Sequence, residues 1–571
     1  MAQDHIRVEA KPAATVILLR DGAQGIEVFM LRRTEAANFA AGMYVFPGGR
    51  VDDADRDTAW GLRCHGLTDT NGHPHAGLAD DGLPYMIAAV RECFEEAGLL
   101  LARDRNDAKA DVIDLHDSAN AERYAAVRDD LNGGKIDFNA LCGEFGLTLA
   151  LDQMAYLTRW ITPVGQPKRF DTRFFIAAVP ANQTGSHDNQ ETTDHLWVRP
   201  ADAMARYAAR EINLMHPTRY CLKYLLEFEH AAAAIANARR LETVPLFRPR
   251  RARTLKGFDA FREYDPQYAE IRKLDPGETS SAWGVIVPGK VIRLSPTIER
   301  VTAPNPGIMT GPGTNSYLIG TGLRIGVLDP GPADPAHIAA LQEAIGARTV
   351  GWILITHTHL DHSPAAALLQ EALAKQLTEK PLVIGLPAPM GQDASFVPGH
   401  QPAHGEVLDI GGVALTALHT PGHASNHICW LHAAESLLFT GDHIMQGSTV
   451  VINPPDGDMG AYLDSLRALR ERAEHIKLEW LAPAHGFLIE QPLRAIDRLV
   501  AHRLMRENKV LAALAAQPAA TLPQLLPVVY DDVPAGRSAW ASRSLLAHLQ
   551  KLRHDGRAIE TDAGWIKVEN A

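Results

Sequence analysis

The chain has 571 residues, 46% of them hydrophobic and 22% charged, a composition that predicts a folded protein with several domains. Its formal net charge of −12 argues against nucleic-acid binding through bulk charge, although it does not exclude a local basic patch. The five cysteines are scattered and no apolar run reaches about 18 residues, so we expect a reducing, cytoplasmic location without disulfides or membrane spans.

The first part of the chain reads as strands followed by a helix. Two apolar stretches, 13–19 and 26–32, flank a turn and predict a β-hairpin. Residues 44–51 follow as a strand that runs into a Pro-Gly-Gly turn. A polar insertion rich in glycine and aspartate, 52–82, separates that turn from a helix predicted over 85–99, whose apolar positions share one face.

The opposite face of this helix is acidic. Glu92, Glu95 and Glu96 lie three and four positions apart, so they share one side of the helix, next to Arg91. Carboxylates held this close repel one another unless cations neutralise them, and hard oxygen ligands favour Mg²⁺ or Mn²⁺. In an isolated helix such glutamates more often form a solvated acidic surface than a metal site. The preceding turn decides between these two interpretations.

The turn FPGG at 46–49 and the run RECFEEAGL at 91–99 together resemble the Nudix box, here split by the insertion. The second half is complete. Counted back from its arginine, the glutamate expected in the first half falls at Leu83 and the expected glycine at Gly77. The split form resembles the branch of Nudix hydrolases that includes coenzyme A diphosphatases, over residues 13–241.

This resemblance implies hydrolysis of a diphosphate linkage by attack of water on phosphorus, with Mg²⁺ or Mn²⁺ held by Glu92, Glu95 and Glu96. Glu95 and Glu96 are the candidate catalytic residues, and Glu191 is a further candidate base or ligand. Four cationic side chains are candidates for phosphate contact, with surface ion pairs as the alternative: Arg91, Lys168, Arg169 and Arg173. Because Leu83 departs from the family pattern, a non-catalytic ligand sensor is a second interpretation.

Residues 246–284 are basic and contain proline, which predicts a linker or a segment that packs between domains. The next domain contains a short apolar strand, 352–355, that leads into the sequence THTHLDH at 356–362. Three histidines and an aspartate are thus delivered together on the loop that leaves a buried strand. No hydrophobic core requires four such groups in six positions, and imidazole suits zinc or iron.

Three further candidate ligands each follow a strand-like apolar segment, so we expect them to converge on the same site: His423, Asp442 and His485. These residues, in this order, resemble the metallo-β-lactamase-fold hydrolases. The resemblance implies two ions of zinc, or else manganese or iron. It divides the ligands as follows: His357, His359 and His423 for the first ion, Asp361, His362 and His485 for the second, and Asp442 as the bridge.

The chemistry implied by this pair of ions is hydrolysis without a serine or cysteine nucleophile. A bound dication lowers the pKa of water from about 15.7 towards about 7, and two ions can hold the nucleophile and polarise the leaving oxygen. Asp361 is the candidate catalytic carboxylate that orients the nucleophile or accepts its proton. His427 and His443 are interpreted as supporting residues, because seven ligands already suffice.

The segment 501–571 predicts three helices and a hairpin, the pattern of a winged helix. The first helix starts at residue 501, Thr521 caps a short second one that Pro527 is expected to end, and the third spans 543–556. Winged helices bind nucleic acid in some proteins and pack against a neighbouring domain or a second copy in others, so RNA contact and packing or homodimerisation both stay open.

We therefore predict a multidomain chain with α/β and α+β parts. It would consist of a Nudix-like α/β/α sandwich (1–245), a linker (246–284), an αββα metallo-β-lactamase sandwich (285–500) and a winged helix (501–571). The second half most resembles the endoribonuclease-like group of its superfamily, which implies phosphodiester cleavage in single-stranded RNA. The alternative is a thioester or ester hydrolase of the glyoxalase II type, acting on a small molecule. Water activated by the same ions can also attack a carbonyl carbon.

Overall fold

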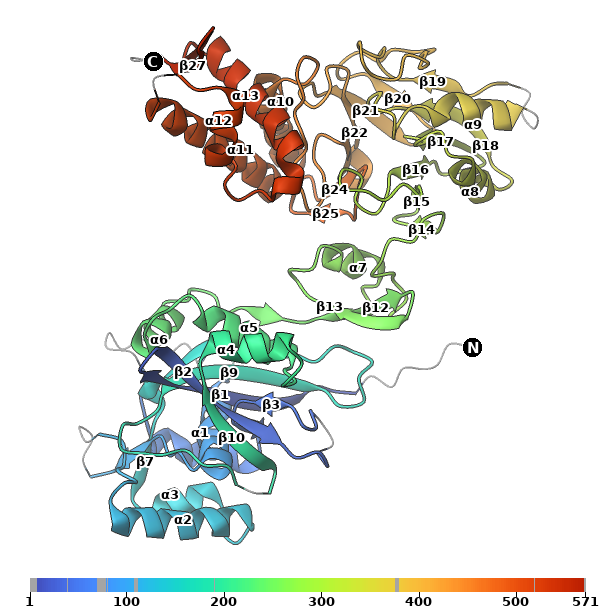
Figure 1. Ribbon diagram of the computed structural model, residues 1–571. Helices are drawn as coiled ribbons and strands as arrows, with labels where there is room; N and C mark the ends of the chain where they lie inside the picture. Colours follow the sequence, from blue (N-terminus) through green and yellow to red (C-terminus); the bar gives the residue numbers. More distant parts are fainter. Residues whose placement is uncertain are drawn as a thin grey trace. The chain divides into compact units, whose positions relative to one another are not determined.

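The computed structural model describes residues 8–568 except 38–39, 69–78, 80, 107–110, 189, 375–378 and 518. The chain divides into two compact units, residues 1–251 and 252–571, whose elements are labelled in Figure 1. The position Gly77, expected for a glycine of the split box, lies outside the described residues. No helix in the described ranges is long and apolar enough to cross a membrane.

A mixed sheet forms the centre of the first unit, in the order β10-β2-β1-β9-β8-β11, with β3 and β4 paired to β2 and β1. The predicted hairpin is present as β1 and β2, while β1 runs parallel to β9 on its other side. The strands are β1 (Lys11–Gly22), β2 (Gly25–Arg33), β3 (Tyr44–Val45), β4 (Gly48–Arg50), β8 (Met154–Ile161), β9 (Phe170–Ala178), β10 (Thr192–Val198) and β11 (Leu246–Phe247).

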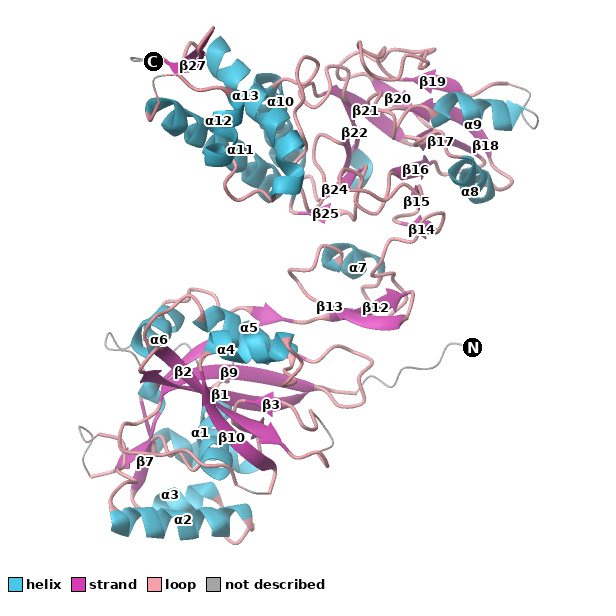
Figure 2. Cartoon of the chain, in the orientation of Figure 1, coloured by secondary structure: helices cyan, strands magenta, loops and turns pink. Residues whose placement is uncertain are grey.

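Helices cover both faces of this sheet, as Figure 2 shows. Side chains alternate along β1, so Val16 and Leu18 pack with α1 on one face while Ile17 and Leu19 pack with α5 and α6 on the other. The helices are α1 (Leu83–Ala97), α2 (Ser118–Asn132), α3 (Phe138–Glu144), α4 (Pro200–Ala208), α5 (His216–Leu225) and α6 (Ala231–Arg239). A small sheet of β5 (Cys64–His65), β7 (Leu147–Ala150) and β6 (Ala102–Asp104) completes the unit.

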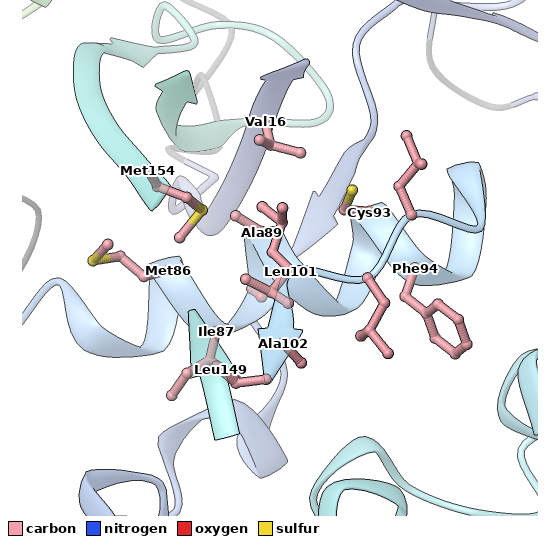
Figure 3. Packing of buried hydrophobic residues seen from close by; sticks show 14 of the residues in the cluster. Val16, Met86, Ile87, Ala89, Cys93, Phe94, Leu101, Ala102, Leu149 and Met154 are labelled. Carbon is pink, nitrogen blue, oxygen red and sulfur yellow. The ribbon is translucent and has the colours of Figure 1, made fainter. Parts of the chain in front are cut away.

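Helix α1 is fixed by its apolar side and by its C-terminal glycine. Ile87, Ala89 and Phe94 are buried in the core shown in Figure 3. Gly98 ends the helix in the left-handed conformation, with φ of 66°, and its backbone N–H returns to the last turn. The acidic side of α1 therefore has a defined orientation towards the turn that contains β4.

The segment expected to be a linker, 246–284, forms regular structure. It contains β11, β12 (Arg250–Thr254), β13 (Gly257–Phe261) and α7 (Tyr268–Leu274). Glu270 of α7 accepts two hydrogen bonds from Arg300, at 2.7 and 2.8 Å, and one from the backbone N–H of Leu488. Both charged side chains are buried, so α7 is built into the second unit.

Two six-stranded sheets pack face to face in the second unit. The first has the order β14-β15-β16-β17-β18-β19, with β14 (Val291–Arg293), β15 (Ile298–Thr302), β16 (Asn315–Ile319), β17 (Arg324–Leu328), β18 (Thr349–Leu354) and β19 (Leu382–Ile384). The second has the order β20 to β25, with β20 (Val407–Asp409), β21 (Ala414–His419), β22 (Ile428–His432), β23 (Leu437–Gly441), β24 (Trp480–Pro483) and β25 (Ile489–Glu490).

Helices flank both sheets and make this unit an αββα sandwich. Helices α8 (Pro335–Ile345) and α9 (Ala365–Ala374) share a core with the first sheet. Helices α10 (Met459–Ile476) and α11 (Pro492–Ala515) share a core with the second. The predicted αββα arrangement of this unit is therefore present.

The winged helix consists of the end of α11, α12 (Leu522–Val529), α13 (Ser538–His554) and the hairpin β26 (Ala558–Thr561) and β27 (Gly564–Lys567). Helix α11 is continuous, so the domain boundary expected at residue 500 falls inside it. Helix α12 continues two residues past Pro527, contrary to prediction. Leu525 and Val529 are fully buried, and this packing compensates for the single backbone donor that the proline lacks.

Candidate metal centres

The seven ligands predicted for the second unit all lie just beyond the carboxyl ends of strands, in the loops after β18, β21, β23 and β24. Because β18 belongs to one sheet and the other three strands to the second, the packing of the two sheets brings these loops together. The side chains form two groups whose ligand atoms lie within 4.8 Å of one another: His357, His359 and His423, then Asp361, His362, Asp442 and His485.

Three imidazole nitrogens converge in the first group. Nδ1 of His359 lies 2.9 Å from Nε2 of His357 and 3.0 Å from Nε2 of His423. Nδ1 of His423 donates to the Val451 carbonyl at 3.0 Å, which leaves its Nε2 without a proton. A single proton on His359 cannot serve both neighbours, so at least two lone pairs face each other. This arrangement fits a bound cation.

The second group also brings potential ligand atoms together, and two of its four members are carboxylates. Nε2 of His485 lies 3.3 Å from Asp361 and 3.2 Å from Oδ1 of Asp442, and Nε2 of His362 lies 3.5 and 3.6 Å from the same oxygens. Within the described part of the chain, three of these buried atoms make no hydrogen bond: Nε2 of His362, Nε2 of His485 and Oδ1 of Asp442. Buried polar atoms without partners are costly, and a divalent cation would satisfy all three.

Asp442 lies between the two groups. Its Oδ1 faces His485 and His362, while its Oδ2 lies 3.7 Å from Nε2 of His423. The two oxygens of one carboxylate are thus directed to different groups, which is the geometry that a bridging ligand requires. The bridging role itself stays a prediction.

The pKa shifts agree with this donor chemistry. Burial and the charge of His362 hold the pKa of His357 well below its usual value, so it is a neutral ligand at pH 7. Burial lowers the pKa of His485, but the carboxylates of Asp442 and Asp361 outweigh burial and raise it to about 10. The carboxylates of the second group therefore attract positive charge to the position where a cation would bind.

Asp329 is a functional residue that the sequence analysis missed. It follows β17 and is buried. One oxygen accepts from Thr356 Oγ1 and lies 3.0 Å from Nδ1 of His362, and the other accepts from the Thr356 backbone N–H. It fixes the orientation of His362 and leaves Nε2 free for a ligand role. Its signal in the sequence is an aspartate at the end of an apolar strand, directly before Pro330-Gly331.

The two histidines excluded from the ligand sets, His427 and His443, are fully buried outside both groups. The ring of His427 stacks at 5.1 Å on that of His357, and its Nδ1 lies 2.9 Å from Thr420 Oγ1. The structure thus places it behind the ligand His357.

The acidic face of α1 forms a second, looser cluster in the first unit. Glu96 accepts a hydrogen bond from the Gly48 N–H at 2.9 Å, and Arg33 lies 3.9 Å from Glu96 and 3.3 Å from Glu191. Burial raises the pKa of Glu92 to about 8, and burial with the charge of Glu92 raises that of Glu96. A nearby cation would stabilise the ionised form of these carboxylates.

Arg91 lies among the carboxylates of this cluster. Its guanidinium group is buried and binds Asp55 at 3.0 Å through two nitrogens, Glu92 at 3.0 Å and Glu95 at 2.8 Å. It therefore orients the glutamates, and its role as a phosphate contact stays a prediction.

Asp55 is the acidic residue that pairs with the arginine of the split box. The expected glycine and glutamate of the first half are six positions apart, and the same interval counted forward from Gly49 reaches Asp55. Gly49 also approaches Glu92 closely, since a Cβ atom there would lie 2.3 Å from a carboxylate oxygen. Counting backward from Arg91 across the insertion led instead to Leu83, the first residue of α1.

The other three predicted phosphate contacts differ in burial: Arg169 and Arg173 are buried and Lys168 is exposed. Arg169 is buried and donates to the carbonyls of Val8 and Thr162. Arg173 is buried, donates to the Ala79 carbonyl and lies over the ring of Tyr85. Both side chains are buried among these partners, and their role as phosphate contacts stays a prediction. Lys168 is exposed in the connection before β9.

Comparison with known proteins agrees with this architecture. Family models match three parts of the chain: the NUDT19 Nudix domain at 67–225, the metallo-beta-lactamase superfamily at 309–485 and the beta-lactamase associated winged helix domain at 521–565. A solved NUDIX hydrolase from Alicyclobacillus acidocaldarius is 28% identical over 42% of this chain and 98% of its own, with a TM-score of 0.34.

Two curated relatives match about half of this chain. The beta-lactamase-like protein 2 homolog of Drosophila melanogaster is 30% identical over 278 residues, 47% of this chain and 91% of its own length. The atrochrysone carboxyl ACP thioesterase of Passalora fulva is 30% identical over 298 residues, 48% of this chain and 82% of its own length. The chain belongs to the metallo-β-lactamase superfamily, and it is a hydrolase that fuses this fold to a Nudix domain and a winged helix. The superfamily fold implies divalent metal ions, for which the two groups of ligands described above are suited.

Proposed function

We propose that the metallo-β-lactamase site hydrolyses a thioester, or a related ester, of a hydrophobic acyl group. The observation that carries the proposal is Leu360. It lies between the ligands His359 and Asp361, yet its side chain is 70% exposed. An apolar side chain held in solvent between two ligands is suited to contact an apolar part of a substrate.

A neighbouring loop adds a second exposed apolar side chain. Met390 is 93% exposed, and its loop is tied to the ligand loop because Asp393 donates its backbone N–H to the Thr358 carbonyl and accepts from Ser363. Thr358 also donates to Gln392 at 2.6 Å. Unbranched, flexible methionine adapts to acyl chains of different shapes.

The charged groups nearest the ligands bear on the choice between a thioester and RNA. The ionised groups that chiefly shift the pKa values of the ligands are the other ligands and Asp329, which are histidines and aspartates. RNA binding relies on lysine and arginine near the phosphates. The name of one relative, an ACP thioesterase, supports the same choice.

Phosphodiester cleavage in single-stranded RNA is the second candidate, and the winged helix is the observation that favours it. Its basic residues, however, are largely paired within the domain: Lys551 with Glu507 and Asp555, and Arg553 with Glu560. Paired cations are less available for phosphate, so this candidate ranks below the thioester.

Two ions bound at this site would supply an activated water and polarise the carbonyl oxygen. Asp361 has the most exposed side chain of the second group and lies 3.3 Å from Nε2 of His485. It is therefore placed to orient the water and hold its proton. Asp361 is ionised, since the positive charge of His362 holds its pKa below its usual value despite burial.

For the first unit we propose hydrolysis of a diphosphate-linked compound, with Mg²⁺ or Mn²⁺ at Glu92, Glu95 and Glu96. The raised pKa values of Glu92 and Glu96 support a cation there. A coenzyme A thioester carries both bonds, a thioester and a diphosphate, so one molecule would offer a substrate to each unit.

The test uses purified full-length protein loaded with Zn²⁺ and Mg²⁺, and long-chain acyl-coenzyme A as the probe, with products identified by mass spectrometry. We expect release of the coenzyme A thiol to be abolished in His359→Ala and retained in Glu95→Gln. Cleavage of the diphosphate should be retained in His359→Ala and abolished in Glu95→Gln. A parallel reaction with single-stranded RNA separates the candidates. RNA cleavage that disappears in His359→Ala, without any thioester cleavage in the wild type, would overturn the thioester proposal. If Glu95→Gln still cleaves the diphosphate, another residue must carry that reaction. If the wild type does not cleave it, the ligand-sensor interpretation of the first unit is favoured.

A further inference from the structure

The ligand His423 is oriented by a backbone carbonyl that belongs to a distant segment. Its Nδ1 donates to the Val451 carbonyl at 3.0 Å. A carbonyl oxygen can only accept, so this contact fixes the tautomer and leaves the Nε2 lone pair directed at His359. The orientation of the first group therefore depends on where residues 450–452 are held.

Two helices hold this 450–452 segment. One contacts Val450 and the other contacts Ile452, the two neighbours of Val451. On one side, the guanidinium group of Arg503 in α11 donates to the Val450 carbonyl. On the other side, the Ile452 backbone N–H donates to Ser544 Oγ of α13 at 3.4 Å. The Val451 carbonyl is thus fixed between a contact from α11 and a contact from the winged helix.

Buried packing reinforces both contacts. Val450 and Ile452 share a core with Tyr462 of α10, Leu499 of α11 and Ala547 of α13. Arg503 is buried and its guanidinium group lies 5.4 Å from the centre of the Tyr462 ring.

The backbone of His423 is held against the same core. A Cβ atom on Gly422, its neighbour, would lie 2.3 Å from the Tyr462 Cα atom, and Ser465 donates to the Pro421 carbonyl at 2.8 Å. Helix α10 thus fixes the backbone of the ligand, while α11 and α13 fix the carbonyl that orients its ring.

We propose that α11 and the winged helix position the metal ligand His423 through the 450–452 segment, with Arg503 and Ser544 as positioning residues. The winged helix then has a role inside this chain, as part of the support of the hydrolase site. The proposal concerns metal binding, so it holds whichever ester or phosphodiester the site cleaves.

The variant Arg503→Met tests this directly, because it keeps the length and apolar packing of the side chain and removes its donors. Metal content of the full-length protein is measured after dialysis against increasing concentrations of a competing chelator. We expect one ion to be lost at a chelator concentration roughly 10- to 100-fold lower than in the wild type, the usual effect of removing a group that orients a ligand. The absorption spectrum of the Co²⁺-loaded protein should change as well, since it reports ligand geometry.

Arg467→Met is the matched control. Arg467 lies exposed on α10 and forms its ion pair with Asp464 on the surface of the same helix, so metal retention and the Co²⁺ spectrum should match the wild type. Arg503→Lys, which keeps a cationic donor, should recover part of the loss. A folded Arg503→Met protein with wild-type metal retention and an unchanged Co²⁺ spectrum would overturn the proposal.

Ser544→Ala is the second variant, and it decides the question if Arg503→Met does not fold. It removes one hydroxyl group from the winged helix and leaves Arg503 in place. We expect a smaller loss of metal retention in the same direction. Unchanged retention in a folded Ser544→Ala protein would show that α13 does not position the ligand.

Discussion

Arg91 and Asp55 form a buried ion pair whose role is to hold two other carboxylates in place. The two side chains meet at 3.0 Å in a fork that matches the planar guanidinium group, and Arg91 then reaches Glu92 and Glu95. Removing one partner of such a pair takes away part of the negative charge that neutralises the buried guanidinium group.

We therefore expect Asp55→Asn to lower the stability of the first unit, by about 1–3 kcal/mol, and also the proposed hydrolysis of a diphosphate. Urea unfolding and Mg²⁺-dependent release of product measure the two effects. Asp53→Asn, an exposed aspartate of the same short helix, is the control and should change neither. Wild-type values in Asp55→Asn would show that Asp55 does not replace the glutamate of the box.

Asp329 plays the corresponding part in the second unit, since its carboxylate accepts from Thr356 twice and faces His362. An amide in its place would direct an N–H group at donors. We expect Asp329→Asn to weaken metal retention by roughly 10- to 100-fold, measured by chelator competition. The exposed Asp464→Asn should behave as wild type, and equal retention in the two variants would contradict a positioning role.

At the scale of elements, α7 shows how a basic, proline-containing segment becomes part of a domain. The carboxylate of Glu270 accepts hydrogen bonds from Arg300 and from the Leu488 N–H, and these contacts are buried. Glu270→Gln should destabilise the second unit by about 3–5 kcal/mol, because Arg300 would remain charged without a partner.

The measurement is a urea titration of the full chain, followed through the unfolding of the second unit. Arg272→Met is the control. Arg272 sits on the same helix and pairs with Glu490 near the surface, where such pairs contribute about 0–1 kcal/mol. Equal, small effects of both substitutions would show that α7 is not anchored by its buried pair.

For the whole molecule, the two compact units offer different donor groups to a metal ion, glutamates in the first and histidines with aspartates in the second. Removal of metal should therefore affect their unfolding differently. Chelation of tightly bound divalent ions should lower the unfolding temperature of residues 252–571, because ions that bind only the folded state add about 2.7 kcal/mol each at 100 times Kd. The unit formed by residues 1–251, with its looser carboxylate cluster, should change less.

Differential scanning calorimetry with and without a strong chelator resolves the two transitions. His357→Ala, which lacks a ligand of the first group, should show a smaller response of the second unit to the chelator than the wild type. A response confined to the first unit would contradict the assignment of the tight site to the histidine groups.

By itself, the sequence determined the order and type of the domains and the candidate ligands of both sites. It could do so because these are local patterns: HTHLDH on one loop, RECFEEAGL on one helix, and short motifs at strand ends. A pattern of this kind places chemically distinct side chains a few residues apart, where helix or strand geometry relates them directly.

Only the tertiary structure decided which groups orient those ligands. Asp55 lies 36 residues from Arg91, Asp329 lies 33 residues from His362, and the Val451 carbonyl lies 28 residues from His423. Backbone carbonyls carry no sequence signature, and contacts across an insertion or between two sheets have no fixed spacing. The sequence therefore shows the groups that bind, while the folded chain shows the groups that hold them in place.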